Sequence, residues 1–210
     1  DTVATVSNSG LITAVSEGAT TITVKAYNGV SVDVAVKVLP GPTGLTLNSE
    51  AETLGVNEKF TVKVDATEPT EAVGVYTYTS SKTSVAKVSS TGVVTAVKAG
   101  MATITVTAQT GVFATMTITV KAAPSSVKLS PTSAKLGVNE TLVLETIIPT
   151  NASGAVTYTT SKATVATVDE VGKVTATGIG TATITARTYN GKTATCKVTV
   201  AAEPTGFEAI

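Results

Sequence analysis

The sequence contains no histidine, no tryptophan and only one cysteine, Cys196. Histidine is the commonest general base and metal ligand near neutral pH, so its absence removes a Ser-His-Asp arrangement from consideration. A single cysteine cannot form a disulfide within the chain, so the domains must be held together by packing. We therefore predict a chain that is not an enzyme, with no catalytic residue, no cofactor and no metal site.

Charge is also scarce in this sequence. Charged residues make up 14% of the chain, and Lys+Arg and Asp+Glu are equal at 15 each. Without a positive excess, the chain lacks the attraction for phosphate backbones and anionic lipid that nucleic-acid and membrane binding use. No apolar run approaches the roughly 18 residues that a membrane-spanning helix needs. We predict no nucleic-acid partner and no membrane insertion in this stretch.

The most informative feature that is present is a repeat. Its three copies are VATVSNSGLITAV, VAKVSSTGVVTAV and VATVDEVGKVTAT, at residues 3–15, 85–97 and 165–177. The copies begin 82 and 80 residues apart, which is too long for a solenoid repeat and suits a small autonomous sandwich domain. A second motif, LGVNE, occurs at residues 54–58 and 136–140. The sequence therefore predicts one β-rich unit copied in tandem.

The repeat divides the chain into four predicted segments. Residues 1–39 match only the C-terminal half of a unit, 41–121 and 123–201 are complete units, and 202–210 are a linker and the start of a further unit. A half unit of about 40 residues buries too little apolar surface to offset its chain entropy. We therefore expect its apolar residues to pack against strands supplied upstream in the parent chain or by a neighbouring molecule. These residues are Val3, Val6, Ile12, Ile22 and Val24.

Alternation of apolar residues with threonine predicts short strands in each unit. Apolar residues occupy every second position from Phe60 to Val64 and from Ala102 to Ala108. Such period-two patterns place one face of a strand in a core and the other in water. The Asn-Gly pairs that begin at Asn28 and Asn190 predict tight two-residue hairpins. Six to eight strands per unit, without helical stretches, predict an all-β fold of antiparallel sandwiches.

Two long segments carry a resemblance to a known family. They are VYTYTSSKTSVAKVSSTGVVTAVKAGMATITVTAQTG at 75–111 and VTYTTSKATVATVDEVGKVTATGIGTATITARTYNGKTATCKVTV at 156–200. They resemble the bacterial immunoglobulin-like domain of group 2, also known from the intimin and invasin stalks. The resemblance implies tandem immunoglobulin-like antiparallel β-sandwiches. The family often has tryptophan where this chain has Tyr78 and Tyr158, so each tyrosine brings a hydroxyl that needs a partner.

Four residues are candidates for ligand contact. Tyr27 and Tyr189 stand before the hairpin Asn-Gly pairs, where exposed rings could bind sugars or proteins, or else pack over the end of the sandwich. Glu68 and Glu71 flank Pro69 in a loop and could offer oxygens to calcium or simply be solvated. The same choice applies to Asp169 and Glu170. Cys196 takes the place of a methionine in the sister unit, which favours a core residue over a nucleophile.

The predicted function follows from the repeat and its joints. Short proline-containing linkers restrict hinge motion, which favours a semi-rigid spacer or stalk. The family occurs in bacterial surface proteins, secreted enzymes and phage virion proteins, so the resemblance implies an extracellular, cell-surface location or a virion. One alternative is an adhesive module that binds host protein or surface glycan through its tip loops. Another is an ancillary segment of a secreted carbohydrate-active enzyme. The expected partners are neighbouring repeats, with intermolecular completion of the half unit as a further prediction.

Overall fold

The computed structural model describes residues 2–202, and within them the chain forms strands and turns but no helix. The predicted start of a further unit lies outside the described residues. Contacts divide the chain into two compact units. The first contains residues 1–50, 62–79 and 105–116, and the second contains residues 51–61, 80–104 and 117–210. We call residues 3–38 the half repeat, 41–121 the middle repeat and 123–201 the last repeat; these repeat limits stay a prediction.

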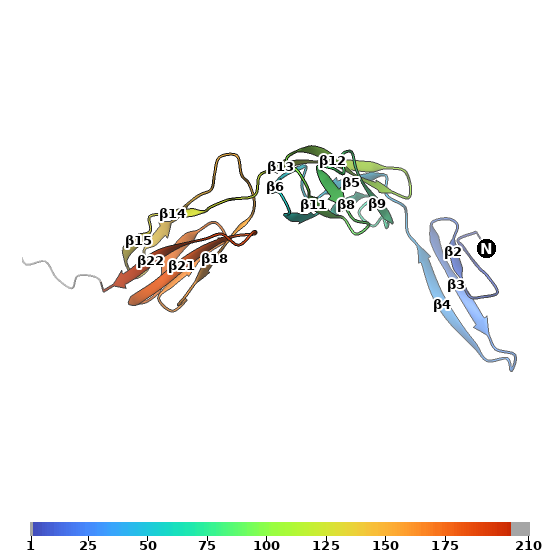
Figure 1. Ribbon diagram of the computed structural model, residues 1–210. Coiled ribbons are helices and arrows are strands. Elements are labelled where there is room, and N and C mark those ends of the chain that lie inside the picture. Colours follow the sequence, from blue (N-terminus) through green and yellow to red (C-terminus); the bar gives the residue numbers. More distant parts are fainter. Residues whose placement is uncertain (1, 203–210) are drawn as a thin grey trace, which may run out of the picture. The chain divides into compact units, whose positions relative to one another are not determined.

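The half repeat consists of two antiparallel pairs of strands, drawn in blue in Figure 1. The short pair is β1 (Ala4–Val6) with β2 (Ile12–Ala14), and the long pair is β3 (Gly18–Lys25) with β4 (Ser31–Val38). Threonine is frequent on these strands because its branched side chain fits the pleated surface. The first unit also contains the antiparallel pair β5 (Gly44–Leu47) and β8 (Val64–Glu68).

The last repeat lies wholly in the second unit and shows the complete architecture. Four strands form one sheet in the order β15-β22-β21-β18, three form a second sheet in the order β16-β20-β19, and β14 pairs with β17. The strands are β14 (Lys128–Ser130), β15 (Ser133–Gly137), β16 (Thr141–Val143), β17 (Glu145–Ile147), β18 (Val156–Thr160), β19 (Ala166–Val168), β20 (Lys173–Ala176), β21 (Gly180–Thr188) and β22 (Thr193–Ala201). The predicted all-β, tandem sandwich fold is confirmed.

The middle repeat has the same strand orders, β6-β13-β12-β9 and β10-β11-β7. Its remaining strands are β6 (Ala51–Gly55), β7 (Lys59–Thr61), β9 (Tyr76–Ser80), β10 (Ala86–Val88), β11 (Val93–Ala96), β12 (Gly100–Ala108) and β13 (Phe113–Lys121). Each complete repeat therefore has nine strands where six to eight were predicted. The alternating run from Phe60 to Asp65 is divided, because β7 pairs with β11 whereas β8 pairs with β5.

The sheets are not purely antiparallel, which corrects one expectation. Strand β15 pairs in parallel with β22, and β6 pairs in parallel with β13. Parallel strands cannot be joined by a tight hairpin and need a long crossover connection, usually a helix. Here the two paired strands stand near opposite ends of a repeat, so the intervening strands of the sandwich serve as the connection. All other strand pairs with a described register are antiparallel.

The Asn-Gly hairpins differ from the two-residue turns that were predicted. The Gly29 N–H donates to the Ala26 carbonyl and the Ala26 N–H donates to the Val30 carbonyl, so three residues form the loop. Only Gly29 has a positive φ, of 88°, and Asn28 does not. This is the three-residue loop in which a glycine bulge follows a turn, a common alternative to the two-residue turn. The loop before Lys192 has the same hydrogen bonds, from Gly191 to Thr188 and from Thr188 to Lys192.

The core of the last repeat is formed by the alternate residues that the sequence singled out. Ile184 on β21 and Cys196 on β22 are directly opposite each other and completely buried. Leu136, Leu142 and Tyr158 pack against the edge of this cluster. The cluster consists of Leu129, Leu144, Val165, Ala166, Val174, Ala176, Ala182, Ile184, Ala186, Cys196, Val198 and Val200. The inward direction predicted for alternate residues is thus confirmed.

Candidate functional site

The two tyrosines predicted at domain tips have different surroundings. Tyr27 lies in the loop between β3 and β4 and is 105% exposed. Tyr189 occupies the same place between β21 and β22 but is half-buried. Its hydroxyl donates a hydrogen bond of 2.7 Å to the Val56 carbonyl of the middle repeat. Of the two alternatives that the sequence left open, packing applies to Tyr189, and its ring packs against a neighbouring repeat.

The contact of Tyr189 leads to a residue that sequence reasoning missed, Glu58. Glu58 ends the first LGVNE motif and is 7% exposed, although it is charged. Its Oε2 accepts a 2.8 Å hydrogen bond from the Gly55 N–H within the same turn. Its Oε1 accepts a 2.6 Å hydrogen bond from the Ala155 N–H of the last repeat. The only signal in the sequence was the recurrence of LGVNE itself.

Local sequence explains why the LGVNE turn holds its carboxylate in place. Asn57 adopts a positive φ of 73°, a conformation that asparagine tolerates better than most residues. The Glu58 N–H donates to the Gly55 carbonyl and closes the turn. On the far side, Asn57 donates to the Ala96 carbonyl, and Ala96 donates to the Glu58 carbonyl. The turn is therefore anchored to β11 before any contact with the last repeat.

The backbones of the middle and last repeats lie close together at this contact. The Ser153 N–H donates to the Ala122 carbonyl at 3.0 Å. A Cβ added to Gly55 would lie 2.2 Å from the Ser153 carbonyl oxygen, and one added to Gly154 would lie 2.2 Å from the Tyr189 ring. Only glycine fits at these two positions. We call this set of residues the inter-repeat joint: Gly55, Val56, Glu58, Ser153, Gly154, Ala155 and Tyr189.

Through Tyr189, the inter-repeat joint is expected to lower the free energy of unfolding when the pH becomes alkaline. Burial, and secondly the Glu58 carboxylate, raise the pKa of Tyr189 above its ordinary value. An unfolded tyrosine ionises near pH 10. As the pH rises past that point, the unfolded state loses this proton first, so the stabilisation by neutral Tyr189 is present below about pH 10 and lost above it.

Tyr189→Phe tests this dependence. Removing the hydroxyl is expected to cost about 1 kcal/mol at pH 7, the usual net contribution of one hydrogen bond. The cost should shrink as the pH rises through the pKa of the folded tyrosine. Urea titrations followed by circular dichroism, for both proteins between pH 7 and pH 11, measure the difference. A difference that grows with pH would contradict the assignment.

The acidic residues that the sequence singled out do not come together in one site. Glu68 and Glu71 are exposed; the Thr43 N–H donates to the Glu68 carbonyl oxygen, and Glu71 accepts from the Thr70 hydroxyl. Asp169 uses its carboxylate to accept from the Val171 and Lys173 N–H groups of its own turn. Within residues 2–202, no group of three or more histidine, cysteine or acidic side chains is placed to hold a metal ion.

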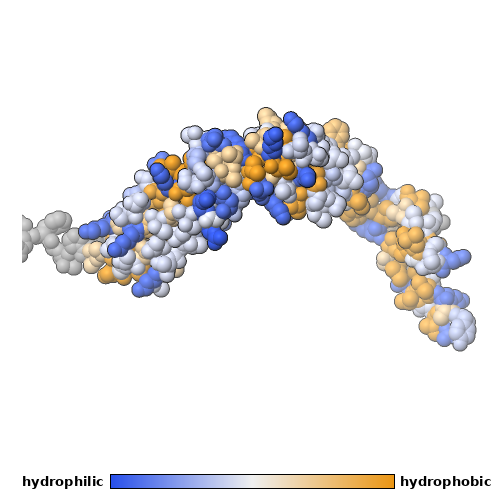
Figure 2. Space-filling view, in the orientation of Figure 1, coloured by the Kyte–Doolittle hydropathy of each residue, from blue (hydrophilic) through white to orange (hydrophobic). Residues whose placement is uncertain are grey.

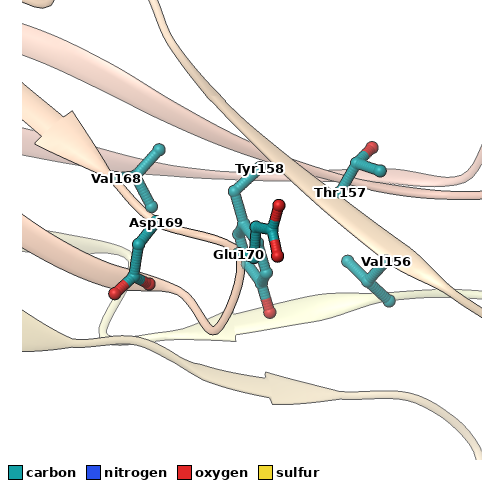
Figure 3. Close-up of a pocket in the computed structure, with 6 residues that line it drawn as sticks. All are labelled: Val156, Thr157, Tyr158, Val168, Asp169 and Glu170. Carbon is teal, nitrogen blue, oxygen red and sulfur yellow. The ribbon is translucent and has the colours of Figure 1, made fainter.

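A shallow hollow of about 570 Å³ lies on the last repeat beside Tyr158. Figure 3 shows the carboxylates of Asp169 and Glu170 pointing in different directions at its rim. The Tyr158 hydroxyl forms a 2.6 Å hydrogen bond with the Thr146 hydroxyl, which supplies the partner that replacing tryptophan by tyrosine requires. The remaining lining residues are Val156, Thr157 and Val168. Burial raises the pKa of the Cys196 thiol, which suits a core residue and not a nucleophile.

The comparisons with known proteins identify the class. Residues 44–120 and 123–198 each match the bacterial Ig-like domain (group 2), and together they cover more than half of the chain. The chain belongs to this family. Across residues 2–202, no helix has the length and apolar character that crossing a bilayer requires.

Two curated proteins are similar to parts of this chain. An uncharacterized protein of Clostridium acetobutylicum is 32% identical over 164 residues, which are 75% of this chain and 17% of that protein. A lacto-N-biosidase of Bifidobacterium bifidum is 46% identical over 68 residues, which are 32% of this chain and 6% of that protein. The chain thus spans less than a fifth of the length of either relative.

Solved structures with a similar fold include domains 4 and 5 of the S-layer protein SbsC. That match has 21% identity and a TM-score of 0.35, and covers 76% of this chain and 98% of the other. A C-terminal fragment of intimin, in complex with the intimin-binding domain of its receptor, matches with 16% identity and a TM-score of 0.32. That match covers 76% of this chain and 64% of the intimin fragment.

Proposed function

We propose that this chain is a non-catalytic, extracellular spacer or stalk that holds another module away from a bacterial surface or a virion. The observation that carries the proposal is the inter-repeat joint. Glu58 and Tyr189 each join the middle repeat to the last repeat with a short hydrogen bond. Such a joint restricts hinge motion between repeats, so each further repeat would increase the length of the stalk.

The outer faces of the strands support the same role. In the last repeat, the positions that alternate with the core on β21 carry Thr181, Thr183 and Thr185. Equal numbers of basic and acidic residues give the chain a formal net charge of +0. Hydroxyl-bearing faces without a dominant charge keep this part of a protein soluble without attracting partners.

A second candidate is an adhesive module. The observation that favours it is the full exposure of Tyr27, because a rigid amphipathic ring suits contacts to sugars and proteins. Exposed Glu68 and Glu71 would be further contacts in this reading. A third candidate is an ancillary segment of a secreted carbohydrate-active enzyme, which the partial similarity to a lacto-N-biosidase favours.

Binding arrays distinguish these functions. We expect no binding when the protein is applied to arrays of surface glycans and host extracellular proteins, because a spacer needs none. The matched control is Tyr27→Ser, which removes the exposed ring. Binding that disappears in Tyr27→Ser would overturn the spacer proposal in favour of the adhesive module.

The half repeat adds a proposal about assembly. Val34 on β4 is 41% exposed, whereas Met116, at the equivalent position of the middle repeat, is 1% exposed. Further apolar side chains of the half repeat are exposed, and Figure 2 shows hydrophobic surface on this part of the chain. These exposed residues are Val6, Leu11, Ile12, Val15, Val24, Val30 and Val32. We propose that strands from a preceding segment of the parent chain, or from a neighbouring molecule, cover this face by β-strand addition.

A further inference from the structure

The second LGVNE motif forms the same turn as the first, and among residues 2–202 its carboxylate has no contact with another repeat. Asn139 has a positive φ of 70°, and the Glu140 N–H donates to the Gly137 carbonyl. The Glu140 Oε2 accepts a 2.7 Å hydrogen bond from the Gly137 N–H, as Glu58 does from Gly55. Glu140 is nevertheless exposed, whereas Glu58 is buried. The carboxylate is therefore already positioned before a partner arrives.

In the middle repeat, the N–H group equivalent to that of Ala155 has a different hydrogen-bond acceptor. Val75 holds the place there that Ala155 holds in the last repeat. The Val75 N–H donates 2.6 Å to Oε1 of Gln109, which stands where the last repeat has Tyr189. The Gln109 Nε2 also donates to the Val73 carbonyl at 3.3 Å. A glutamine at this position thus fills, from within its own repeat, the site that a Glu58-type carboxylate would fill.

The connection from the last repeat to a following repeat would have the same length as the connection from the middle repeat to the last repeat. Pro124, near the start of the last repeat, lies four positions after Val120, and Pro204 lies four positions after Val200. A repeat that starts at Pro204 would therefore present its loop to Glu140 after a connection of the length that brings Ala155 to Glu58.

We propose that the turn from Leu136 to Glu140 is a docking site for another immunoglobulin-like repeat of this family. The fitting partner carries a tyrosine at the hairpin position and an unpaired N–H at the position of Ala155. Its tyrosine donates to the Val138 carbonyl, and its N–H donates to Glu140. A repeat with glutamine at the hairpin position does not fit, since its N–H is already bonded. The side chain at one hairpin position therefore determines which repeats form a stiff joint.

Lengthening the chain tests the proposal. A second copy of residues 124–201 is joined after Glu203, and spin labels are attached at Glu170→Cys and at the same position of the copy. Cys196 is completely buried and is not labelled in the folded protein. Pulsed electron paramagnetic resonance then measures the distribution of label distances. We expect a narrow distribution that broadens at least twofold with Glu140→Ala.

Two further proteins test whether docking depends on Glu140 and on the residue at the hairpin position. Glu58→Ala should leave this distribution narrow, because it opens the other joint. A copy of residues 42–121, which carries Gln109, should give a broad distribution in place of the copy of 124–201, with its label at Ser90→Cys. A distribution that is broad before any substitution, or unchanged by Glu140→Ala, overturns the docking site. Equal distribution widths for the copy with Tyr189 and the copy with Gln109 would overturn the proposal that the hairpin side chain determines which repeats dock.

The inference rests on the proposed stalk function only in requiring stiff joints. Binding of a glycan or a host protein on the arrays would overturn the spacer function and leave the label distances as they are. Conversely, a flexible Glu140 joint would refute the docking site while the arrays remain silent. The two failures are therefore distinguishable.

Discussion

Gly55→Ala is expected to break the inter-repeat joint without unfolding the middle repeat. The new methyl group would lie 2.2 Å from the Ser153 carbonyl oxygen and 2.4 Å from the Tyr189 hydroxyl, distances that require the two repeats to separate. Separation loses the Tyr189 and Glu58 hydrogen bonds across the joint, which together contribute about 2 to 4 kcal/mol on usual values for neutral and charged bonds. The last repeat should lose about that much stability.

The single cysteine gives a direct measurement. The Cys196 thiol is completely buried in the last repeat, so its labelling by a thiol reagent in increasing urea reports the unfolding of that repeat. Gly137→Ala is the matched control, because its Cβ would have its nearest neighbour, Cδ of Glu140, at 3.4 Å, an ordinary contact. The control should change stability by less than about 1 kcal/mol. Equal effects of the two substitutions would contradict the joint.

Ile184→Ala is expected to destabilise the last repeat by about 3 to 4 kcal/mol, the range for removing a large aliphatic side chain from a packed core. Ile184 is completely buried, and it faces Cys196 across the β21 and β22 pair. The same labelling of Cys196 in urea measures this change. A loss below about 1 kcal/mol would mean that the site collapses around the smaller residue or that the core is not closed.

Ile22→Ala is the matched substitution in the half repeat, and it also tests completion by another segment. Ile22 stands at the position equivalent to Ile184 but is only half buried. In a monomer of 21.0 kDa, alanine should cost little stability there, measured by hydrogen exchange of β3 and β4. If a neighbouring molecule covers this face, light scattering of the unsubstituted protein should give a larger mass that Ile22→Ala reduces. A folded monomer with a strong Ile22→Ala effect would contradict the proposal.

Much of the fold could be predicted because it depends on local alternation. The period-two runs that contain Ile104 and Ile184 assign the inward residues correctly, since any sandwich must bury one face of each strand. The strand count failed at Val62 and Lys63, where the chain passes from β7 to β8. Alternation continues through that change of partner, so the sequence contains no break to detect.

The inter-repeat joint could not be predicted in the same way. LGVNE on its own indicates a turn, and the carboxylate of Glu58 would be read as solvated. Its burial depends on Ala155, which lies 97 residues further along the chain. The choice between an exposed and a packed Tyr189 stayed open for the same reason, because its exposure is set by a neighbouring repeat and not by its own hairpin. Besides the recurrence of LGVNE, the sequence carried one signal, the difference between Tyr189 and Gln109, and its meaning depends on knowing both contacts.

The parallel pairing of β15 with β22 has a mechanical consequence. The early strand of the last repeat and its final strand run side by side in the same direction, with five residue pairs from Ser133 and Lys197 to Gly137 and Ala201. Tension transmitted along the polypeptide would pull these neighbours in opposite directions along their length. Their hydrogen bonds are then loaded in shear and must rupture together instead of unzipping one at a time. A chain of such repeats would withstand drag that peels simple hairpins apart.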